Sequence, residues 1–109
     1  MNIPSALFRG EFMRVVGKDK LSSFGQSHAD VKGAVSAWLH EAEEATWRMP
    51  KDIKDRYAHA SFLAGNRVVF NLKGRDYRLV VVVSFALQIV SVEKIGTHAE
   101  YSTWDLNRG

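Results

Sequence analysis

The feature that most constrains the fold of this chain is a nearly apolar run, LVVVVSFAL, from Leu79 to Leu87. A membrane-spanning helix needs roughly 20 apolar residues, about twice the length of this run. Its four consecutive valines favour a β-strand. We therefore expect a buried strand and no membrane span. A chain of 109 residues, 46% of them hydrophobic, is long enough for one core and too short for two independent domains.

Strand patterns occupy the second half of the chain. Segments 67–72, 76–85 and 89–95 are rich in Val, Ile, Phe and Tyr. The glycine-containing sequence Lys73–Arg75 is typical of a hairpin turn between the first two segments. The pattern predicts a meander of three antiparallel strands.

Helical patterns come before the strands. Residues 18–26 fit a short amphipathic helix interrupted at Gly25, and Ser27 with Asp30 matches a capping box for a longer helix. From Val31 to Ala45, apolar residues recur every three or four positions, as on one helical face. The expected fold is α+β, with N-terminal helices packed on one face of a small antiparallel sheet and the other face partly free.

The first twelve residues, MNIPSALFRGEF, lack the apolar core of a secretory signal. Met13 restarts the chain just before a strand-like Arg14–Val16. We interpret residues 1–12 as an appended or alternative leader and residues 13–109 as one domain. The absence of cysteine excludes disulfides, thiolate metal sites and cysteine nucleophiles, and suits a reducing cytoplasm.

The sequence contains no motif for nucleotide-cofactor or metal binding. The glycines lack the spacing of a phosphate loop or a dinucleotide fingerprint, and the four histidines lack metal-ligand spacing. We therefore expect no nucleotide cofactor and no metal. Glu41, Glu43 and Glu44 could form an acid/base pair, but beside an apolar helical stripe they are more typical of a solvated face.

Positive charge is concentrated near the predicted strands. The net charge is +3, and Arg67, Lys73, Arg75 and Arg78 face a single nearby anion, Asp76. This balance permits a polyanionic partner. Lys73 and Arg75 lie in the turn, where solvation alone would explain them. Arg78 lies among Val and Leu residues, so it needs either a carboxylate partner or an exposed working face.

Two further candidates follow the last predicted strand. His98 is expected in a polar loop, where an imidazole can transfer protons, although a surface histidine would fit the same position. Tyr101 is either a functional hydroxyl or an aromatic residue at the edge of the core.

Three strings in this chain resemble the HigB family of bacterial type II toxins. They are RVVFNL at 67–72, YRLV at 77–80 and GTHAEY at 96–101, and the likeness runs from about Met13 to Tyr101. The resemblance implies a RelE-like α+β protein that cleaves messenger RNA on the ribosome, without a cofactor, and that is silenced by a cognate HigA-type antitoxin. It also implies a catalytic role for Arg78, His98 and Tyr101. Asn71 lies where several relatives carry a catalytic lysine, and Lys73 could supply that cation instead.

We therefore expect a cytoplasmic, metal-independent endoribonuclease that inhibits translation. Arg78 would bind the phosphate, His98 would transfer a proton, and Tyr101 would orient the reacting groups. RNA contacts are expected from four other residues, namely Arg67, Asn71, Lys73 and Arg75. The alternatives are a nonenzymatic RNA- or ribosome-binding module, which would depend mainly on total charge, and a structural interaction domain, which would not depend on these residues.

Overall fold

The computed structural model describes residues 12–106; residues 1–11 and 107–109 lie outside the described part. The leader expected over residues 1–12 therefore falls outside it, apart from Phe12. Met13 already belongs to the fold, because it is 3% exposed. Its backbone N–H also donates a hydrogen bond to the carbonyl oxygen of Ala45, at 2.9 Å.

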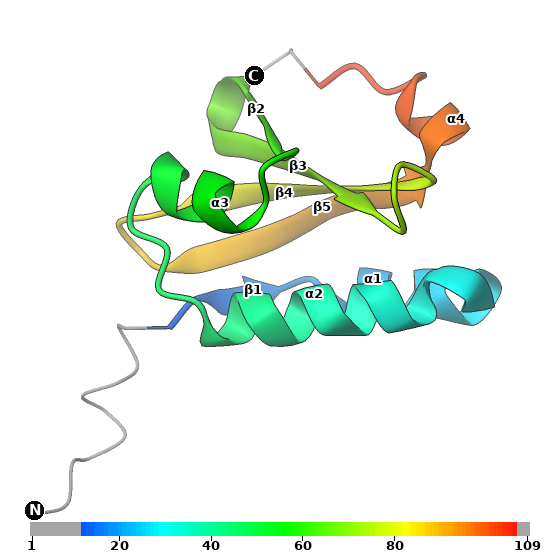
Figure 1. Ribbon diagram of the computed structural model, residues 1–109, viewed down its shortest axis with the longest axis horizontal. Coiled ribbons are helices and arrows are strands. Elements are labelled where there is room, and N and C mark those ends of the chain that lie inside the picture. The colour runs from blue at the N-terminus through cyan, green and yellow to red at the C-terminus, as the bar shows by residue number, and fades with distance from the viewer. Residues whose placement is uncertain (1–11, 107–109) are drawn as a thin grey trace, which may run out of the picture.

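Helices and strands follow one another in the order that the sequence predicts, with short additions (Figure 1). In chain order they are β1 (Arg14–Val16), α1 (Lys18–Ser27), the 3₁₀ helix η2 (Ala29–Val31), α2 (Lys32–Glu44), α3 (Pro50–Arg56), β2 (Ser61–Leu63), the 3₁₀ helix η3 (Ala64–Asn66), β3 (Arg67–Leu72), β4 (Tyr77–Ser84), β5 (Ile89–Thr97) and α4 (His98–Tyr101). Within residues 12–106, no helix is long and apolar enough to cross a membrane.

The five strands form one sheet in the order β1-β5-β4-β3-β2. The antiparallel meander of β3, β4 and β5 confirms the prediction. The sheet as a whole is mixed, because β1 joins β5 in parallel while β2 joins β3 antiparallel. The valine run forms the central strand, where Val80 and Val81 face opposite sides and are both 0% exposed. Its lack of polar alternation therefore reflects burial on both faces.

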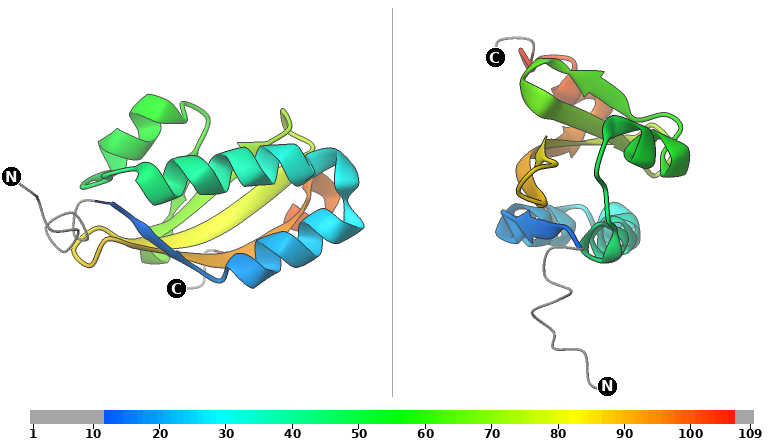
Figure 2. Two further views of the ribbon diagram at one scale, coloured as in Figure 1. Left: turned by 90° about the horizontal axis from the view of Figure 1, so that it is seen from below. Right: turned by 90° about the vertical axis from the view of Figure 1, so that its left-hand side faces the viewer.

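One face of the sheet packs against α1, α2 and α3 (Figure 2). The strands supply one half of this core: Val68, Phe70, Leu79, Val81, Val83 and Val90. The helices supply the other half with Leu21, Val35, Trp38, Ala42 and Ile53. The helices therefore close one face, as the sequence predicts.

The opposite face carries a second, smaller apolar cluster. Val69 and Val80 are buried there under Leu106, and Leu63, Tyr101 and Trp104 pack around them. The chain after α4 thus returns over this face and covers part of it. Among residues 12–106, no further buried apolar cluster covers the rest of this face, which is called the open face below.

The predicted capping box of the long helix is wrong. Ser27 is the last residue of α1, and α2 begins at Lys32 without a side-chain cap. Asp30 instead accepts hydrogen bonds from the Tyr77 hydroxyl at 2.8 Å and from Lys73 Nζ at 3.0 Å. These longer-range donors bind the carboxylate that the local motif assigned to a helix start.

Candidate functional site

A polar hollow of about 230 Å³ lies on the open face of the sheet, near the β3–β4 turn. It is lined by His59, Ser61, Val69, Asn71, Arg75, Arg78 and Tyr101. Four of these residues are site candidates from the sequence: Asn71, Arg75, Arg78 and Tyr101. Two arginines and a histidine line the hollow and no carboxylate does, so its chemistry suits an anionic ligand.

Strand register places the centre of this hollow. Asn71 in β3 pairs with Arg78 in β4, and Arg78 pairs with Gly96 in β5. Side chains alternate along a strand, so Asn71 and Arg78 face the open side, whereas Phe70 and Leu79 face the helices. A shift of one residue in the strand register at the turn would direct polar side chains toward the buried face.

Arg78 is partly buried, and within residues 12–106 no carboxylate forms an ion pair with it. Its Nη1 donates a hydrogen bond to the backbone oxygen of Arg75 at 2.7 Å. Its Cζ lies 5.3 Å from the centre of the Tyr101 ring, which is a cation–π contact. Of the two environments expected for this arginine, the carboxylate partner is therefore not found among the described residues, and Arg78 lines a hollow instead.

Tyr101 reaches the hollow from α4, where the sequence predicted a loop. Thr97 caps this short helix: its hydroxyl oxygen accepts a bond from the Glu100 N–H at 3.1 Å. The Glu100 carboxylate in turn accepts one from the Thr97 N–H at 2.7 Å. This capping box fixes the direction in which the chain leaves β5 and brings Tyr101 beside Arg78.

His59 is a candidate that the sequence interpretation missed. It lies between α3 and β2, in a segment without periodic pattern, and it lines the hollow. The signal that could have found it is strand register. Ser61 pairs with Val69, and the same register continued by two residues sets His59 opposite Asn71.

A second hollow of about 410 Å³ adjoins the first and shares His59, Asn71 and Arg75 with it. Its other lining residues come from the α3–β2 connection and the β3–β4 turn: Arg56, Tyr57, Ala58, Ala60 and Gly74. The two hollows are therefore neighbours, and basic side chains line both.

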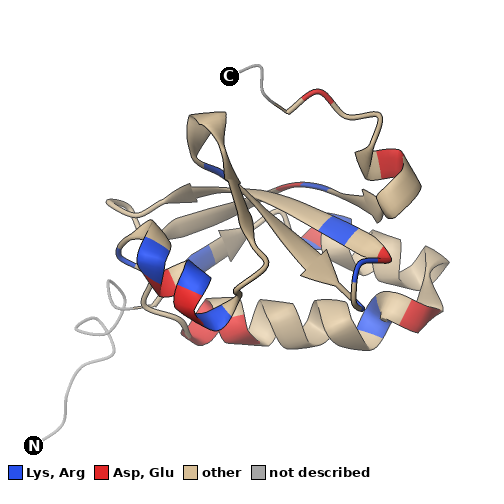
Figure 3. Ribbon diagram, turned by 45° about the horizontal axis from the view of Figure 1, so that its top comes forward, with Lys and Arg blue, Asp and Glu red and all other residues tan. Residues whose placement is uncertain are grey.

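Two of the predicted RNA contacts lie outside these hollows. Arg67 forms an ion pair with Glu93, with 2.8 Å between Nε and Oε1, and this bond lowers the pKa of the Glu93 carboxyl. Lys73 forms an ion pair with Asp30, whose pKa is lowered by the bonds from Lys73 and Tyr77. Each cation is already partly neutralised within the fold. The two lie at opposite ends of β3, because Arg67 is its first residue and Lys73 follows its last. Figure 3 shows the Lys and Arg segments interspersed with Asp and Glu segments.

His98 lies at the rim of the site. Its backbone N–H donates to the Asp76 carbonyl oxygen at 2.9 Å, which anchors the start of α4 to the β3–β4 turn. Its side chain is exposed and does not line either hollow. Three residues along a helix separate it from Tyr101, so the two side chains lie on neighbouring sides of α4.

The carboxylates of α2 have partners elsewhere. Glu41 binds Tyr57 and Arg56, and these bonds lower the pKa of its carboxyl. Glu43 pairs with Lys18 at 2.8 Å. Among residues 12–106, no three or more His, Asp or Glu side chains lie close enough together to hold a metal ion. The hollow is therefore built from basic, amide and hydroxyl groups.

A comparison with models of known protein families gives a match over most of the chain. A family model described as HigB toxin, a RelE-like toxic component of a toxin–antitoxin system, matches residues 31–104. These residues include α2, the whole β2–β5 region, α4 and every residue of both hollows. No curated protein matches the sequence.

Proposed function

Because the chain belongs to the HigB family of RelE-like toxins, we propose that it is a ribosome-dependent endoribonuclease that cleaves messenger RNA and so inhibits translation. The observation that carries this proposal is the hollow in which Arg78 has no carboxylate partner among the described residues and contacts the Tyr101 ring. A guanidinium without an ion-pair partner is available to a phosphate. The reaction belongs in the cytoplasm, where ribosomes and messenger RNA meet.

Cleavage of RNA without a metal makes three chemical demands. A base must take the proton of the 2′-hydroxyl, a cation must stabilise the extra negative charge on the phosphate, and an acid must protonate the leaving 5′ oxygen. The hollow and its rim offer arginine, histidine and tyrosine for these tasks. No step in this scheme requires a carboxylate.

Arg78 is the residue we assign to the phosphate. Its guanidinium can donate two parallel bonds to phosphate oxygens, which ammonium groups cannot do with the same geometry. The Arg75 carbonyl and the Tyr101 ring hold it in place before substrate arrives. Tyr101 lines the same hollow, so we assign its hydroxyl to orient the nucleophile or the leaving oxygen.

His59 and His98 are the two candidates for proton transfer. His59 lines the hollow from the segment before β2, on the β3 side of Arg78, whereas His98 follows β5, on the other side of β4. In-line displacement at phosphorus needs its base and its acid on opposite sides of the phosphate. This arrangement supports one histidine for each role. Asn71 and Arg75, which line both hollows, are assigned to the RNA strand.

The test is a translation-coupled cleavage assay on purified variants, with ribosome association measured in parallel. Arg78→Ala should lower cleavage by about 10² to 10³ fold, because one donor aimed at developing charge is worth roughly 3 to 4 kcal/mol. Arg78→Lys should recover only part of this loss. His59→Ala and His98→Ala should each lower cleavage by about 10² to 10⁴ fold if each transfers a proton.

The outcomes separate the candidate functions. Wild-type cutting by Arg78→Ala and by both histidine variants would exclude the mechanism. Loss of ribosome binding in step with cleavage would favour the nonenzymatic RNA-binding module. A large effect of only one histidine variant would assign the proton transfer to that histidine.

As the toxin of a toxin–antitoxin system, the protein has an antitoxin partner. We propose a HigA-type antitoxin that covers the basic hollow, because masking Arg78 would block RNA directly. A bulky partner on the helical face, which keeps the toxin off the ribosome, is the alternative. Protection of Arg78 from phenylglyoxal modification in the complex would support masking, and full reactivity would support the alternative.

A further inference from the structure

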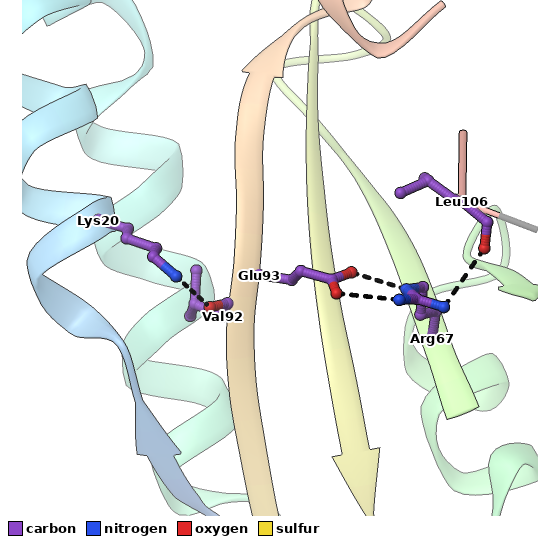
Figure 4. A network of polar contacts seen from close by, with 5 residues as sticks. All are labelled: Lys20, Arg67, Val92, Glu93 and Leu106. Carbon is purple, nitrogen blue, oxygen red and sulfur yellow. Dashed lines mark hydrogen bonds and ion pairs between the residues drawn. The ribbon is translucent and has the colours of Figure 1, made fainter. Parts of the chain in front are cut away.

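A bidentate ion pair crosses the open face beside the hollow (Figure 4). Arg67 Nε lies 2.8 Å from Glu93 Oε1, and Arg67 Nη2 lies 3.1 Å from Glu93 Oε2. The two residues belong to β3 and β5, so the pair spans the intervening strand β4. Their side chains are only 17% and 29% exposed, which limits screening by solvent.

A β-bulge gives Glu93 this position. Val80 pairs with Lys94 and Val81 pairs with Val92, which leaves Glu93 as the extra residue of β5. Glu93 reaches Arg67, and Lys94 Nζ lies 5.4 Å from the centre of the Trp104 ring. Two consecutive side chains of β5 thus make contacts on the open face, and bulges are known to redirect side chains next to functional sites.

The guanidinium of Arg67 also binds the end of the described chain. Its Nη1 donates to the backbone oxygen of Leu106 at 3.4 Å (Figure 4). Leu106 itself is 7% exposed and packs on Val69 and Val80. Residues 102–106, here called the C-terminal strap, pair with no strand, so these contacts hold the strap on the sheet.

Contacts lead from the strap to the hollow. The Trp104 ring packs so closely over Gly96 that a Cβ there would lie 2.8 Å from its Cζ2 atom. Trp104 meets Tyr101 edge to face, with 5.9 Å between ring centres, and Tyr101 meets Arg78 at 5.3 Å. The capping box directs α4 toward Arg78, and the Tyr101 ring then contacts both the strap, through Trp104, and Arg78.

We propose that Arg67 and Glu93 are positioning residues, whose ion pair holds the C-terminal strap on the sheet and thereby fixes Tyr101 against Arg78. The catalytic consequence rests on the proposed function. Arg67 then acts through the strap, in place of the direct RNA contact expected from the sequence. Glu93, which no sequence motif indicated, becomes its necessary partner.

The two roles for Arg67 make opposite predictions for Glu93→Gln. If Arg67 contacts RNA directly, removal of the competing carboxylate should leave cleavage unchanged or tighten RNA binding. If the ion pair holds the strap, Glu93→Gln and Arg67→Gln should both impair catalysis. Arg67→Gln should have the larger effect, because it also removes the bond to Leu106.

The experiment measures cleavage kinetics and amide hydrogen exchange on the full chain. Both variants should lower kcat by about 10- to 100-fold with a change in KM of less than about threefold, as misplacement of a reacting group predicts. The amides of Thr103 and Trp104, which donate to Glu100 and Tyr101, should exchange at least about tenfold faster. Amides of β4 should keep their protection.

The matched control is Lys18→Gln, which breaks an exposed ion pair with Glu43 on the helical side. It should change neither kcat nor exchange in the strap. Reduced kcat with unchanged exchange in the Arg67 and Glu93 variants would overturn the proposal, and so would faster exchange with unchanged kcat. If the wild-type protein cuts no messenger RNA, the proposed function fails; exchange at Thr103 and Trp104 then still decides whether the ion pair holds the strap.

Discussion

The two faces of the sheet are made from alternate residues of the same strands, yet they differ in what covers them. Three helices close one face over Phe70, Leu79 and Val81. The other face has a small apolar cluster under Leu106 and ends in a polar hollow around Arg78. Stability is therefore concentrated on one side of β3 and β4, and the candidate chemistry is concentrated on the other.

This division lets neighbouring residues have unrelated roles. Phe70 is 1% exposed among three aromatic rings, while Asn71 lines both hollows. A substitution on one face should alter folding, and a substitution on the other should alter activity. The following predictions test that separation, from the largest expected effect to the smallest.

Phe70→Ala should have the largest effect. Its ring packs at 4.9 Å from Tyr57, 5.3 Å from Trp38 and 6.2 Å from Trp47, between ring centres. Its removal should lower the free energy of unfolding by about 3 to 5 kcal/mol, as urea denaturation would measure. The control is Asn71→Ala, one residue along the strand, which should change stability by about 0.5 kcal/mol or less while it slows cleavage. Equal destabilisation by both would contradict the separation of the faces.

Gly96→Ala tests the open face. The added methyl group would meet Trp104 and the Glu100 carboxylate at 2.8 Å, so the C-terminal strap must shift. We expect a loss of about 1 to 3 kcal/mol, a fall in kcat, and faster amide exchange at Trp104. Gly33→Ala in α2 is the matched control, because a Cβ there meets no atom within 4 Å. It should leave cleavage unchanged. Wild-type cleavage by Gly96→Ala would show that the strap tolerates displacement.

Acid should destabilise both faces through their carboxylates. The pKa of Glu41 lies below its ordinary value of 4.5 because Tyr57 and Arg56 donate to it. The pKa of Glu93 is lowered by Arg67. A lowered pKa in the folded state gives stability above the ordinary pKa that is lost as pH falls through the folded value. Urea denaturation at a series of pH values from about 7 down to about 3 would cover these carboxyl pKa values. The free energy of unfolding should fall as the pH drops below about 4.5. Glu41→Gln and Glu93→Gln should each flatten that fall, and an unchanged slope in both would contradict this origin.

The sequence predicted those parts of the fold that depend on local pattern. The valine run, the glycine turn at Gly74 and the helical spacing after Val31 lead directly to β4, the hairpin and α2. The capping box at Ser27 failed because Asp30 finds stronger partners in Tyr77 and Lys73, some 40 residues later in the chain. A local sequence motif cannot reveal hydrogen-bond donors that lie so far along the chain.

Site residues divide in the same way. Asn71 and Arg78 face each other in a register that a hairpin of known turn length fixes, so sequence reasoning could bring them together. His59 reaches the site because β2 pairs with β3. A strand of only three residues, 61–63, is too short to be predicted from its sequence pattern. The partners of Arg67 were hidden for another reason. A bulge in β5 directs Glu93 toward Arg67, and Leu106 reaches Arg67 because the chain after α4 folds back over the sheet. Neither feature has a local sequence pattern.

The smallest effect is expected from Arg75→Ala, and it tests how sharply function is focused on the open face. Arg75 is exposed in the turn, and its contribution to Arg78 comes from its backbone oxygen, which alanine retains. The substitution removes one solvent-screened cation, so cleavage should fall by less than about fivefold, equivalent to about 1 kcal/mol or less.

That loss should vanish as salt is raised, because exposed charges are screened. The loss in Arg78→Ala should persist at high salt, because its guanidinium is partly buried and, in the proposed mechanism, binds the reacting phosphate. Parallel cleavage assays at low and high potassium chloride would compare the two variants. An Arg75→Ala effect as large and as salt-resistant as that of Arg78→Ala would contradict this prediction. It would mean that the β3–β4 turn, and not the paired positions Asn71, Arg78 and Gly96, contains the catalytic groups.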